Sequence, residues 1–163
     1  MKKILIVLGS DSDLNVMRAA TEVLARFGVL YELRIASAHR TPALAHELSS
    51  TAREKGFGAI IAAAGKAAHL AGVLASCTTL PVIGVPINAS TLDGLDALLS
   101  TVQMPKGIPV ATVAIDGADN AALLAVEMLA IHDDELAEKL SEYKKEMENA
   151  VIAKDLAARE GKL

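Results

Sequence analysis

Aliphatic runs that alternate with helical stretches constrain the fold of this chain more than any other feature of its sequence. Five such runs cover residues 2–8, 30–36, 59–64, 81–85 and 109–115. Most of them are rich in valine, isoleucine, leucine and alanine, which is typical of strands buried on both faces. Strands that alternate with helices predict a parallel sheet with helices on both of its faces. We therefore expect an α/β fold, a three-layer sandwich around a five-stranded parallel sheet.

The stretches between these runs carry signals for helix ends. Asp13 opens a helical stretch, and Gly28 stands where a left-handed C-terminal cap belongs. Thr41 can cap the second helix with Pro42 at its first position. Further helices are expected over 41–56, from 65 to about Ser76, from the cap Ser90 to about Val102, and from Asp119 to about Ile131. This order of elements favours a flavodoxin-like or Rossmann-like sandwich.

A charged segment, residues 133–163, follows the predicted sheet as a C-terminal helical extension of one domain that spans residues 1–163. Its apolar residues are spaced 4, 3, 4 and 3 apart, a heptad seam formed by Leu136, Leu140, Tyr143, Met147 and Ala150. Two interpretations stay open for this helix. It either lies on its own domain, or its narrow apolar seam packs on another subunit.

Composition narrows the classes of function. A chain of 163 residues with 52% hydrophobic content can bury one sizeable core. A formal net charge of −4 and an aromatic share of 2% argue against nucleic acid as a partner, because binding needs a basic surface or stacking rings. The apolar runs are too short to span a bilayer, so we expect no membrane association. The Met-Lys-Lys start leads directly into a strand-like run, so we expect a cytoplasmic protein.

Cysteine and histidine content bears on metals and nucleophiles. The single cysteine, Cys77, cannot form an internal disulfide or a multi-thiolate metal site, and we interpret it as a small buried thiol. The His, Asp and Glu residues lack the spacing of a metal site, so we predict no metal. His46 and His132 are interpreted as surface or capping residues. The absence of a P-loop or Gly-x-Gly-x-x-Gly pattern argues against nucleoside triphosphates and dinucleotides.

Polar residues follow three of the predicted strands, in the segments 9–13, 37–42 and 65–69. Ligands of open parallel sheets bind at the carboxyl ends of the strands, and in the order 2-1-3-4-5 these three loops are neighbours. The hydroxyls of Ser10 and Ser12, together with backbone N–H groups at a helix N-terminus, can bind a small phosphate. The alternative is that this loop only caps its helix.

Other side chains of these loops suggest proton transfer and anchoring. Asp13 can accept hydrogen bonds from ribose hydroxyls. An imidazole gains and loses a proton near neutral pH and a guanidinium grips a phosphate in a fixed fork, so His39 could react while Arg40 anchors. The plainer interpretation of His39 is an exposed polar residue. His69 is expected just inside the helix after Gly65, where the backbone can approach a ligand.

Several motifs, in this order along nearly the whole chain, resemble the bacterial N5-carboxyaminoimidazole ribonucleotide mutase family. They are Gly-Ser-Asp-Ser-Asp at 9–13, Ser-Ala-His-Arg-Thr-Pro at 37–42, Ala-Gly-Lys-Ala-Ala-His-Leu-Ala-Gly at 64–72, Gly-Val-Pro at 84–86 and Val-Gln-Met-Pro at 102–105. The resemblance implies a homo-octamer that moves a carboxyl group from N5 to C4 of an aminoimidazole ribonucleotide. No ATP, metal or organic cofactor is implied.

The resemblance also implies roles for individual residues. His39 would carry the proton, and the phosphoribosyl group would be held by Ser10, Asp13 and Arg40. Six further residues would line the pocket: Ser12, Ser37, Gly65, Ala67, His69 and Leu70.

Two positions depart from the family's usual third loop, Ala-Gly-Gly-Ala-Ala-His-Leu-Pro-Gly. Lys66 replaces the second glycine and adds a cation that either helps to bind a carboxylate or points into solvent, and Ala71 replaces the proline. Direct carboxylation by carbon dioxide is the alternative reaction, but Arg40 and His69 favour the mutase branch. A non-catalytic flavodoxin-like nucleotide-binding module is the alternative from another class. The chain lacks a receiver's Asp after strand three and has few aromatic residues to stack on a flavin.

Overall fold

The computed structural model describes residues 2–89 and 92–162 of the chain. Its elements are β1 (Lys3–Leu8), a short 3-10 helix η1 (Asp11–Asp13), α1 (Leu14–Phe27), β2 (Tyr31–Ile35), α2 (Pro42–Ser50), β3 (Phe57–Gly65), α3 (Leu70–Ser76), β4 (Val82–Ile87), α4 (Leu95–Val102), β5 (Ala111–Thr112), α5 (Ala118–Ala130) and α6 (Asp134–Arg159). The strands form one parallel sheet in the order β2-β1-β3-β4-β5. The predicted five-stranded α/β sandwich and its strand order are therefore confirmed.

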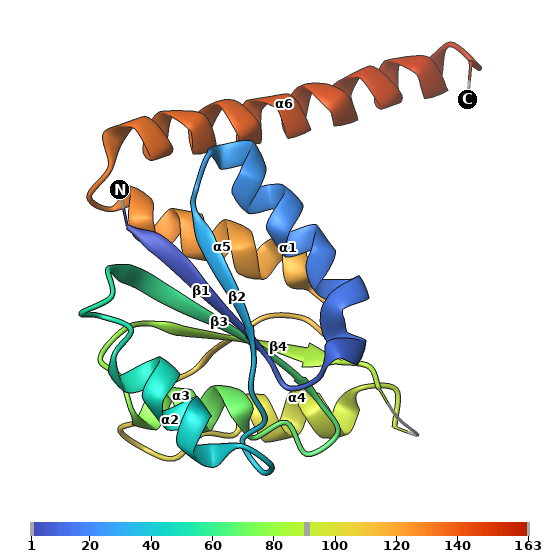
Figure 1. Cartoon of the computed structure of the whole chain (residues 1–163). Coiled ribbons are helices and arrows are strands. Elements are labelled where there is room, and N and C mark those ends of the chain that lie inside the picture. The colour runs from blue at the N-terminus through green and yellow to red at the C-terminus, as the bar shows by residue number, and fades with distance from the viewer. Residues whose placement is uncertain (1, 90–91, 163) are drawn as a thin grey trace.

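Two hydrophobic cores lie on opposite faces of the sheet, because alternate side chains of a strand point to opposite faces. On β1, Ile4 and Ile6 join the core beneath α1, α5 and the start of α6, whereas Leu5 and Val7 join the core beneath α2 and α3. Figure 1 shows the two helical layers on either side of the sheet. Strands buried on both faces explain why their sequences are almost continuously aliphatic.

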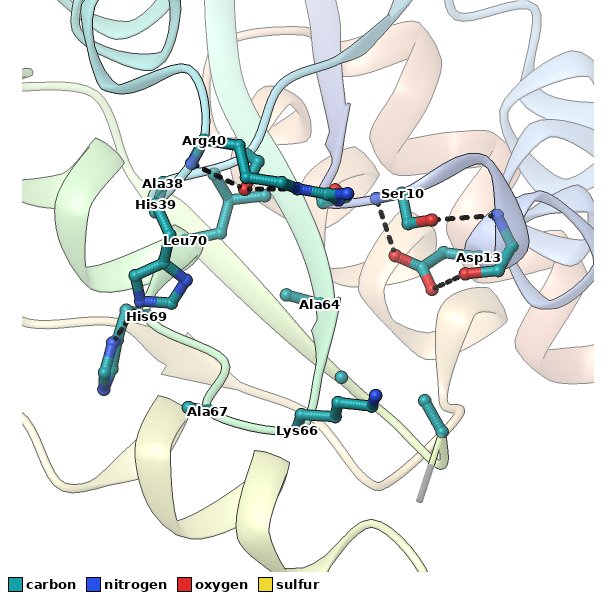
Figure 2. Close-up of a pocket in the computed structure, with 15 residues that line it drawn as sticks. Ser10, Asp13, Ala38, His39, Arg40, Ala64, Lys66, Ala67, His69 and Leu70 are labelled. Carbon is teal, nitrogen blue, oxygen red and sulfur yellow. Dashed lines mark hydrogen bonds between the residues drawn. The ribbon is translucent and has the colours of Figure 1, made fainter.

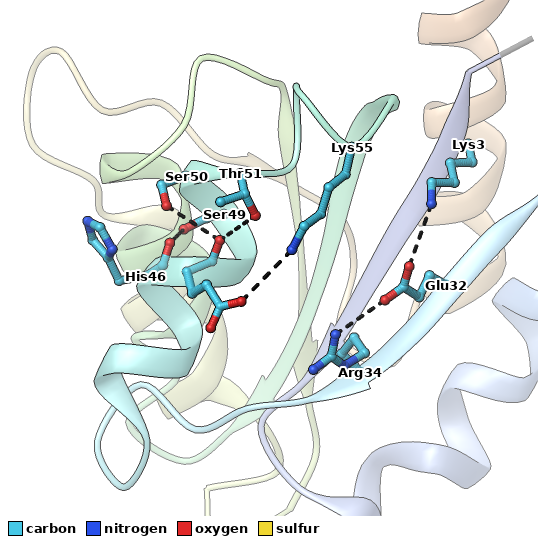
Figure 3. Close-up of polar contacts among 9 residues, drawn as sticks. Lys3, Glu32, Arg34, His46, Ser49, Ser50, Thr51 and Lys55 are labelled. Carbon is cyan, nitrogen blue, oxygen red and sulfur yellow. Dashed lines mark hydrogen bonds and ion pairs between the residues drawn. The ribbon is translucent and has the colours of Figure 1, made fainter.

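The edge strand β2 differs from the central strands because it carries charges. Glu32 on β2 forms ion pairs with Lys3 on β1, at 3.6 Å, and with Arg34, at 3.3 Å (Figure 3). Charged residues on an edge strand discourage another strand from pairing with it. This explains why residues 30–36 show the least aliphatic of the five runs.

Three predicted helix boundaries are wrong, each for a local reason. α2 ends at Ser50 rather than at Gly56, and the hydroxyls of Ser49, Ser50 and Thr51 all donate to backbone carbonyls of the last turns (Figure 3). Such bonds compete with continuation of a helix. α3 begins only at Leu70, so residues 66–69 precede the helix.

The start of α4 was also predicted too early. The proposed cap, Ser90, lies outside the described residues, and α4 begins at Leu95. Asp93 and Gly94 just before it have positive φ values of 51° and 85°, a backbone conformation that a right-handed helix cannot include. β5 is likewise shorter than predicted, since only Ala111 and Thr112 pair with β4.

The heptad seam of α6 divides into two parts. Leu136 is fully buried and Leu140 is 8% exposed, and both belong to the core that α1 and α5 form. Tyr143 packs its ring edge-on against Phe27 of α1, with 5.6 Å between ring centroids. The expectation that Leu136 and Leu140 lie between subunits is therefore wrong, because the chain's own core covers them. Lys144 and Glu146 still form ion pairs with Glu127 of α5 and Arg26 of α1, and beyond Met147 α6 extends away from the domain, as its red end in Figure 1 shows.

Candidate active site

A pocket of about 550 Å³ lies at the carboxyl ends of β1, β2 and β3 (Figure 2). Its lining consists of Gly9, Ser10, Ser12, Asp13, Ser37, Ala38, His39, Arg40, Ala64, Gly65, Lys66, Ala67, His69, Leu70 and Ala89. The structure thus brings together all ten residues that the sequence singled out as candidate site residues. It adds Gly9, Ala38, Ala64, Lys66 and Ala89 to the wall.

The first loop is held by a reciprocal set of hydrogen bonds. Ser10 caps η1, and its Oγ accepts from the N–H of Ser12 at 3.3 Å. Asp13 Oδ2 accepts from the N–H of Ser10 at 3.2 Å, and Asp13 Oδ1 accepts from the hydroxyl of Ser12 at 3.2 Å. The cap is therefore formed by Ser10 on η1, whereas Asp13, at the N-cap position of α1, makes no side-chain cap bond to that helix. A carboxylate oxygen accepts more than one hydrogen bond, so Asp13 can still bind a ligand hydroxyl.

Asp13 is the buried charge of the site, only 3% exposed. Burial raises the pKa of its carboxyl above the usual 3.8, and the hydrogen bonds from Ser12 and Ser10 oppose that shift. A carboxyl with a raised pKa keeps its proton in the folded protein at pH values where the unfolded chain has lost it. The folded state therefore loses stability as the pH rises from about 4 through the raised pKa of Asp13.

Replacing Asp13 with asparagine should remove this cost. The amide retains an oxygen for the N–H of Ser10, and its NH₂ group can donate to Ser12 Oγ. We expect the free energy of unfolding of the variant, minus that of the wild type, to increase with pH above about 4 and then to level off. Urea unfolding of both proteins at several pH values measures this difference. A difference that does not change with pH would show that Asp13 does not ionise inside a desolvated site.

The second loop positions Arg40 with two sets of bonds. Thr41 Oγ1 accepts from the N–H of Ser37 at 2.9 Å and donates to its carbonyl at 3.1 Å, which closes the loop. Thr41 therefore closes the loop and makes no side-chain cap bond to α2, contrary to the prediction. Ser37 Oγ accepts from the backbone N–H and from Nε of Arg40, at 3.2 and 3.5 Å.

The guanidinium of Arg40 also donates from Nη2 to the carbonyl of Gly9, at 3.3 Å. This bond joins the second loop to the first. Arg40 is exposed, and a guanidinium carries five N–H donors, so several remain to face an anionic ligand. Figure 2 shows Arg40 extended toward Ser10 along one wall of the pocket.

Two histidines from different loops meet at the other end of the pocket. His39 Nε2 and His69 Nδ1 are 2.8 Å apart, and the rings are nearly perpendicular, with an interplanar angle of 72°. A hydrogen bond between two imidazole nitrogens needs one N–H donor and one bare acceptor, so the bonded pair shares one proton at this contact. His69 lies at the N-cap of α3, not inside the helix as predicted.

The third loop approaches the fourth closely. A Cβ on Gly65 would lie 2.6 Å from the Cβ of Ala89 and 3.1 Å from the carbonyl oxygen of Ile87, so only glycine fits here. The next residue, Lys66, has a left-handed φ of 58°. Leu70 is 2% exposed and mainly fills the core beneath the pocket. Ala89 lies two residues after β4, and the predicted strand over 81–85 ended too early to point to it.

Within the described residues, no group of three or more His, Cys, Asp or Glu side chains is arranged to hold a metal ion. None of the helices there is long and apolar enough to cross a membrane.

Fold and pocket together define a flavodoxin-like α/β protein with a small-molecule site at the carboxyl edge of its sheet. The chain belongs to the AIR carboxylase family, whose model matches residues 3–150. It is 60% identical over 147 residues to the N5-carboxyaminoimidazole ribonucleotide mutase of Pyrococcus abyssi, covering 90% of this chain and 84% of that one. It is 52% identical to the mutase of Saccharolobus solfataricus, covering 97% of this chain and 100% of that one.

Other relatives are longer. The chloroplastic phosphoribosylaminoimidazole carboxylase of Vigna aconitifolia is 57% identical over 146 residues, and this chain spans only 26% of its length. Among solved structures, PurE of Treponema denticola superposes with a TM-score of 0.83 at 28% sequence identity, covering 93% of this chain and 95% of that one. The family that the sequence motifs resemble is thereby confirmed.

Proposed function

We propose that this chain converts N5-carboxyaminoimidazole ribonucleotide into 4-carboxy-5-aminoimidazole ribonucleotide, an isomerisation in purine biosynthesis. The observation that carries the proposal is identity of 52–60% to mutases of which the chain covers 84–100% of the length. The pocket supports it, because a cation, a buried carboxylate and a histidine pair line one cavity. These groups match the phosphate, the ribose diol and the proton transfer that such a substrate requires.

In the proposed binding mode, the two ends of the pocket hold different parts of the substrate. Arg40 and the hydroxyl of Ser10 bind the 5′-phosphate, where the guanidinium already bridges the first two loops. Asp13 accepts from the ribose hydroxyls with its remaining lone pairs. The imidazole ring of the substrate then lies toward His39 and His69. Ser12, Ser37, Ala67 and Leu70 complete the walls, together with Gly65.

His39 carries the proton in the proposed reaction. As the bond between N5 and the carboxylate carbon breaks, protonated His39 gives its proton to N5, and carbon dioxide and aminoimidazole ribonucleotide are left in the pocket. C4 attacks carbon dioxide and forms the new carbon–carbon bond, and neutral His39 takes the proton from C4. Enclosure of carbon dioxide beside C4 replaces a slow bimolecular encounter. Apart from this one proton, every atom that moves comes from the substrate, so the proposed step calls for no cofactor.

Direct carboxylation is the second candidate, because the plant and yeast relatives are named carboxylases. This chain matches 26% of the length of each of them. One experiment separates the two reactions. The protein is mixed with N5-carboxyaminoimidazole ribonucleotide without ATP or added bicarbonate, and the 4-carboxy product is followed. Product formation at a rate that added bicarbonate does not change supports the mutase. In a second reaction, turnover of aminoimidazole ribonucleotide that depends on added bicarbonate supports the carboxylase, and no turnover of either ribonucleotide rejects both.

We further propose that the chain works in the cytoplasm as a homo-oligomer, and specifically as the octamer that the family resemblance implies. Support comes from α6 beyond Tyr143, where four apolar side chains stay largely exposed: Met147, Val151, Ile152 and Leu156 are 45–66% exposed. Exposed apolar side chains of this kind, at the end of a helix that extends away from its domain, are suited to contact with another subunit.

Charged residues at these exposed apolar positions of α6 should lower the oligomeric mass of the protein. We expect light scattering of the double variant Val151→Glu/Leu156→Glu to give a smaller particle than the wild type, because burying unpaired carboxylates at a contact is costly. Lys154→Glu is the control, since it adds negative charge without removing an apolar contact. A wild-type protein that scatters as a monomer at micromolar concentration, or a double variant of unchanged mass, would contradict the proposal.

A further inference from the structure

We propose that Lys66 binds the carboxylate of the substrate and thereby sets the preference of the pocket for carboxylated ribonucleotides. The inference rests on the proposed function. Lys66 lines the pocket three residues before His69 and replaces the glycine of the motif that the third loop resembles. In this proposal Lys66 is a specificity-determining residue of the pocket.

The backbone at Lys66 supports a role for its side chain. Its φ of 58° lies in the left-handed region, where a Cβ is unfavourable and glycine is not. Within the described part of the chain, the other non-glycine residues with positive φ are Asp93 and Asp116. Aspartate tolerates this conformation better than most residues because its short polar side chain can bond to backbone groups close to it in the chain. The side chain of lysine makes no such local bond, so the unfavourable backbone conformation of Lys66 is uncompensated. Strained residues of this kind are often found at functional sites, and here the strained residue places a cation in the pocket lining.

The charge balance of the pocket points the same way. The ammonium group of Lys66 forms no hydrogen bond or ion pair with any residue that the structure describes, whereas the side chain of Arg40 bonds to Ser37 and Gly9. The one carboxylate in the lining, Asp13, already accepts from the first loop. Two cations and one acid leave a net positive site, which suits a ligand with two separate anionic groups.

The two cations also occupy different walls. Figure 2 shows Arg40 and Lys66 on opposite sides of the pocket, with the third loop carrying both Lys66 and His69. If Arg40 holds the phosphate, the carboxylate is the anionic group left for Lys66. The flexible four-carbon stem of lysine lets its ammonium follow that group as it passes from N5 to C4. A fixed guanidinium fork would be less suited to two successive positions.

The test compares two stable ligands that differ by the carboxylate. Calorimetry measures binding of 4-carboxy-5-aminoimidazole ribonucleotide and of aminoimidazole ribonucleotide to the wild type and to Lys66→Gln, which keeps side-chain length and removes the charge. We expect Lys66→Gln to lose about tenfold or more in affinity for the carboxylated ligand, and less than about twofold for the other. Lys66→Arg should keep most of the preference because it keeps the cation.

Lys66→Gly controls for the backbone. This variant should lose the preference for the carboxylated ligand as Lys66→Gln does, yet unfold at a higher temperature, because glycine adopts the left-handed conformation freely. Equal loss of affinity for both ligands would mean that Lys66 senses the phosphate, and unchanged affinities would mean that it points into solvent. Either result overturns the inference while wild-type turnover still supports the proposed function. If the wild type binds neither ribonucleotide, the proposed function and the inference both fail.

Discussion

Replacing His39 with asparagine should lower kcat by at least ~10²- to 10⁴-fold, the usual contribution of general acid–base catalysis. Asparagine can still donate an N–H to Nδ1 of His69, which lies 2.8 Å from His39 Nε2, so the loops should stay in place. An amide cannot carry a proton between N5 and C4. The loss should therefore fall on kcat, with ribonucleotide binding and the unfolding temperature nearly unchanged.

His46→Asn is the matched control for this experiment. His46 is exposed on α2 (Figure 3), and it is not among the residues that line the pocket. The His46→Asn variant should retain full activity. This control separates the loss of a proton carrier from any general effect of replacing a histidine with asparagine. A His39→Asn enzyme with near-normal kcat would remove His39 from the reaction.

Arg40→Ala should lower kcat/KM for the ribonucleotide by about 1.5–3 kcal/mol, which is roughly 10- to 150-fold. The guanidinium is the only arginine group in the pocket lining that the structure describes, and it is already aimed across the first loop toward Ser10. A dephosphorylated nucleoside should be a poor substrate of the wild type and should respond little to the substitution. Steady-state kinetics with both substrates measures the difference.

Two variants make the Arg40 result specific. Arg18→Ala removes the same charge from an exposed position on α1 outside the pocket and should leave kcat/KM nearly unchanged. Arg40→Lys keeps the charge but loses the planar fork, so it should fall between wild type and Arg40→Ala. Equal damage to nucleotide and nucleoside turnover would show that Arg40 does not contact the phosphate.

The strands and their order could be predicted because parallel strands buried on both faces leave a continuous aliphatic signal. Helix starts were less predictable, since they depend on short-range hydrogen bonds that composition does not reveal. After Gly65, for example, the N–H groups of Ala68 and His69 bond to carbonyls two residues back, which delays α3 to Leu70. These turns could not be foreseen, because Lys66, Ala67 and Ala68 are individually good helix formers.

The candidate site was predictable as a set of loops but not as a set of contacts. Sheet order alone places the ends of β1, β2 and β3 side by side, so the ten candidate residues meet. The bond between His39 and His69 depends on how two loops from separate elements face each other, and no spacing in the sequence encodes that. For the same reason, the seam of α6 could not be divided in advance into the buried Leu136 and the exposed Met147.

The central place of β1 in the sheet has a consequence for synthesis. β1 is made first, but it pairs with β3 along its second edge, where Ile4 lies opposite Ala59 and Leu8 opposite Ala63. At about 5–20 residues per second, a ribosome needs roughly seconds to pass from β2 to the end of β3. During that interval the aliphatic strand β1 has one edge without a partner strand. An open strand edge can pair with the wrong strand or with another chain. His69 follows β3 in the chain, so the histidine pair can form only after this interval has ended.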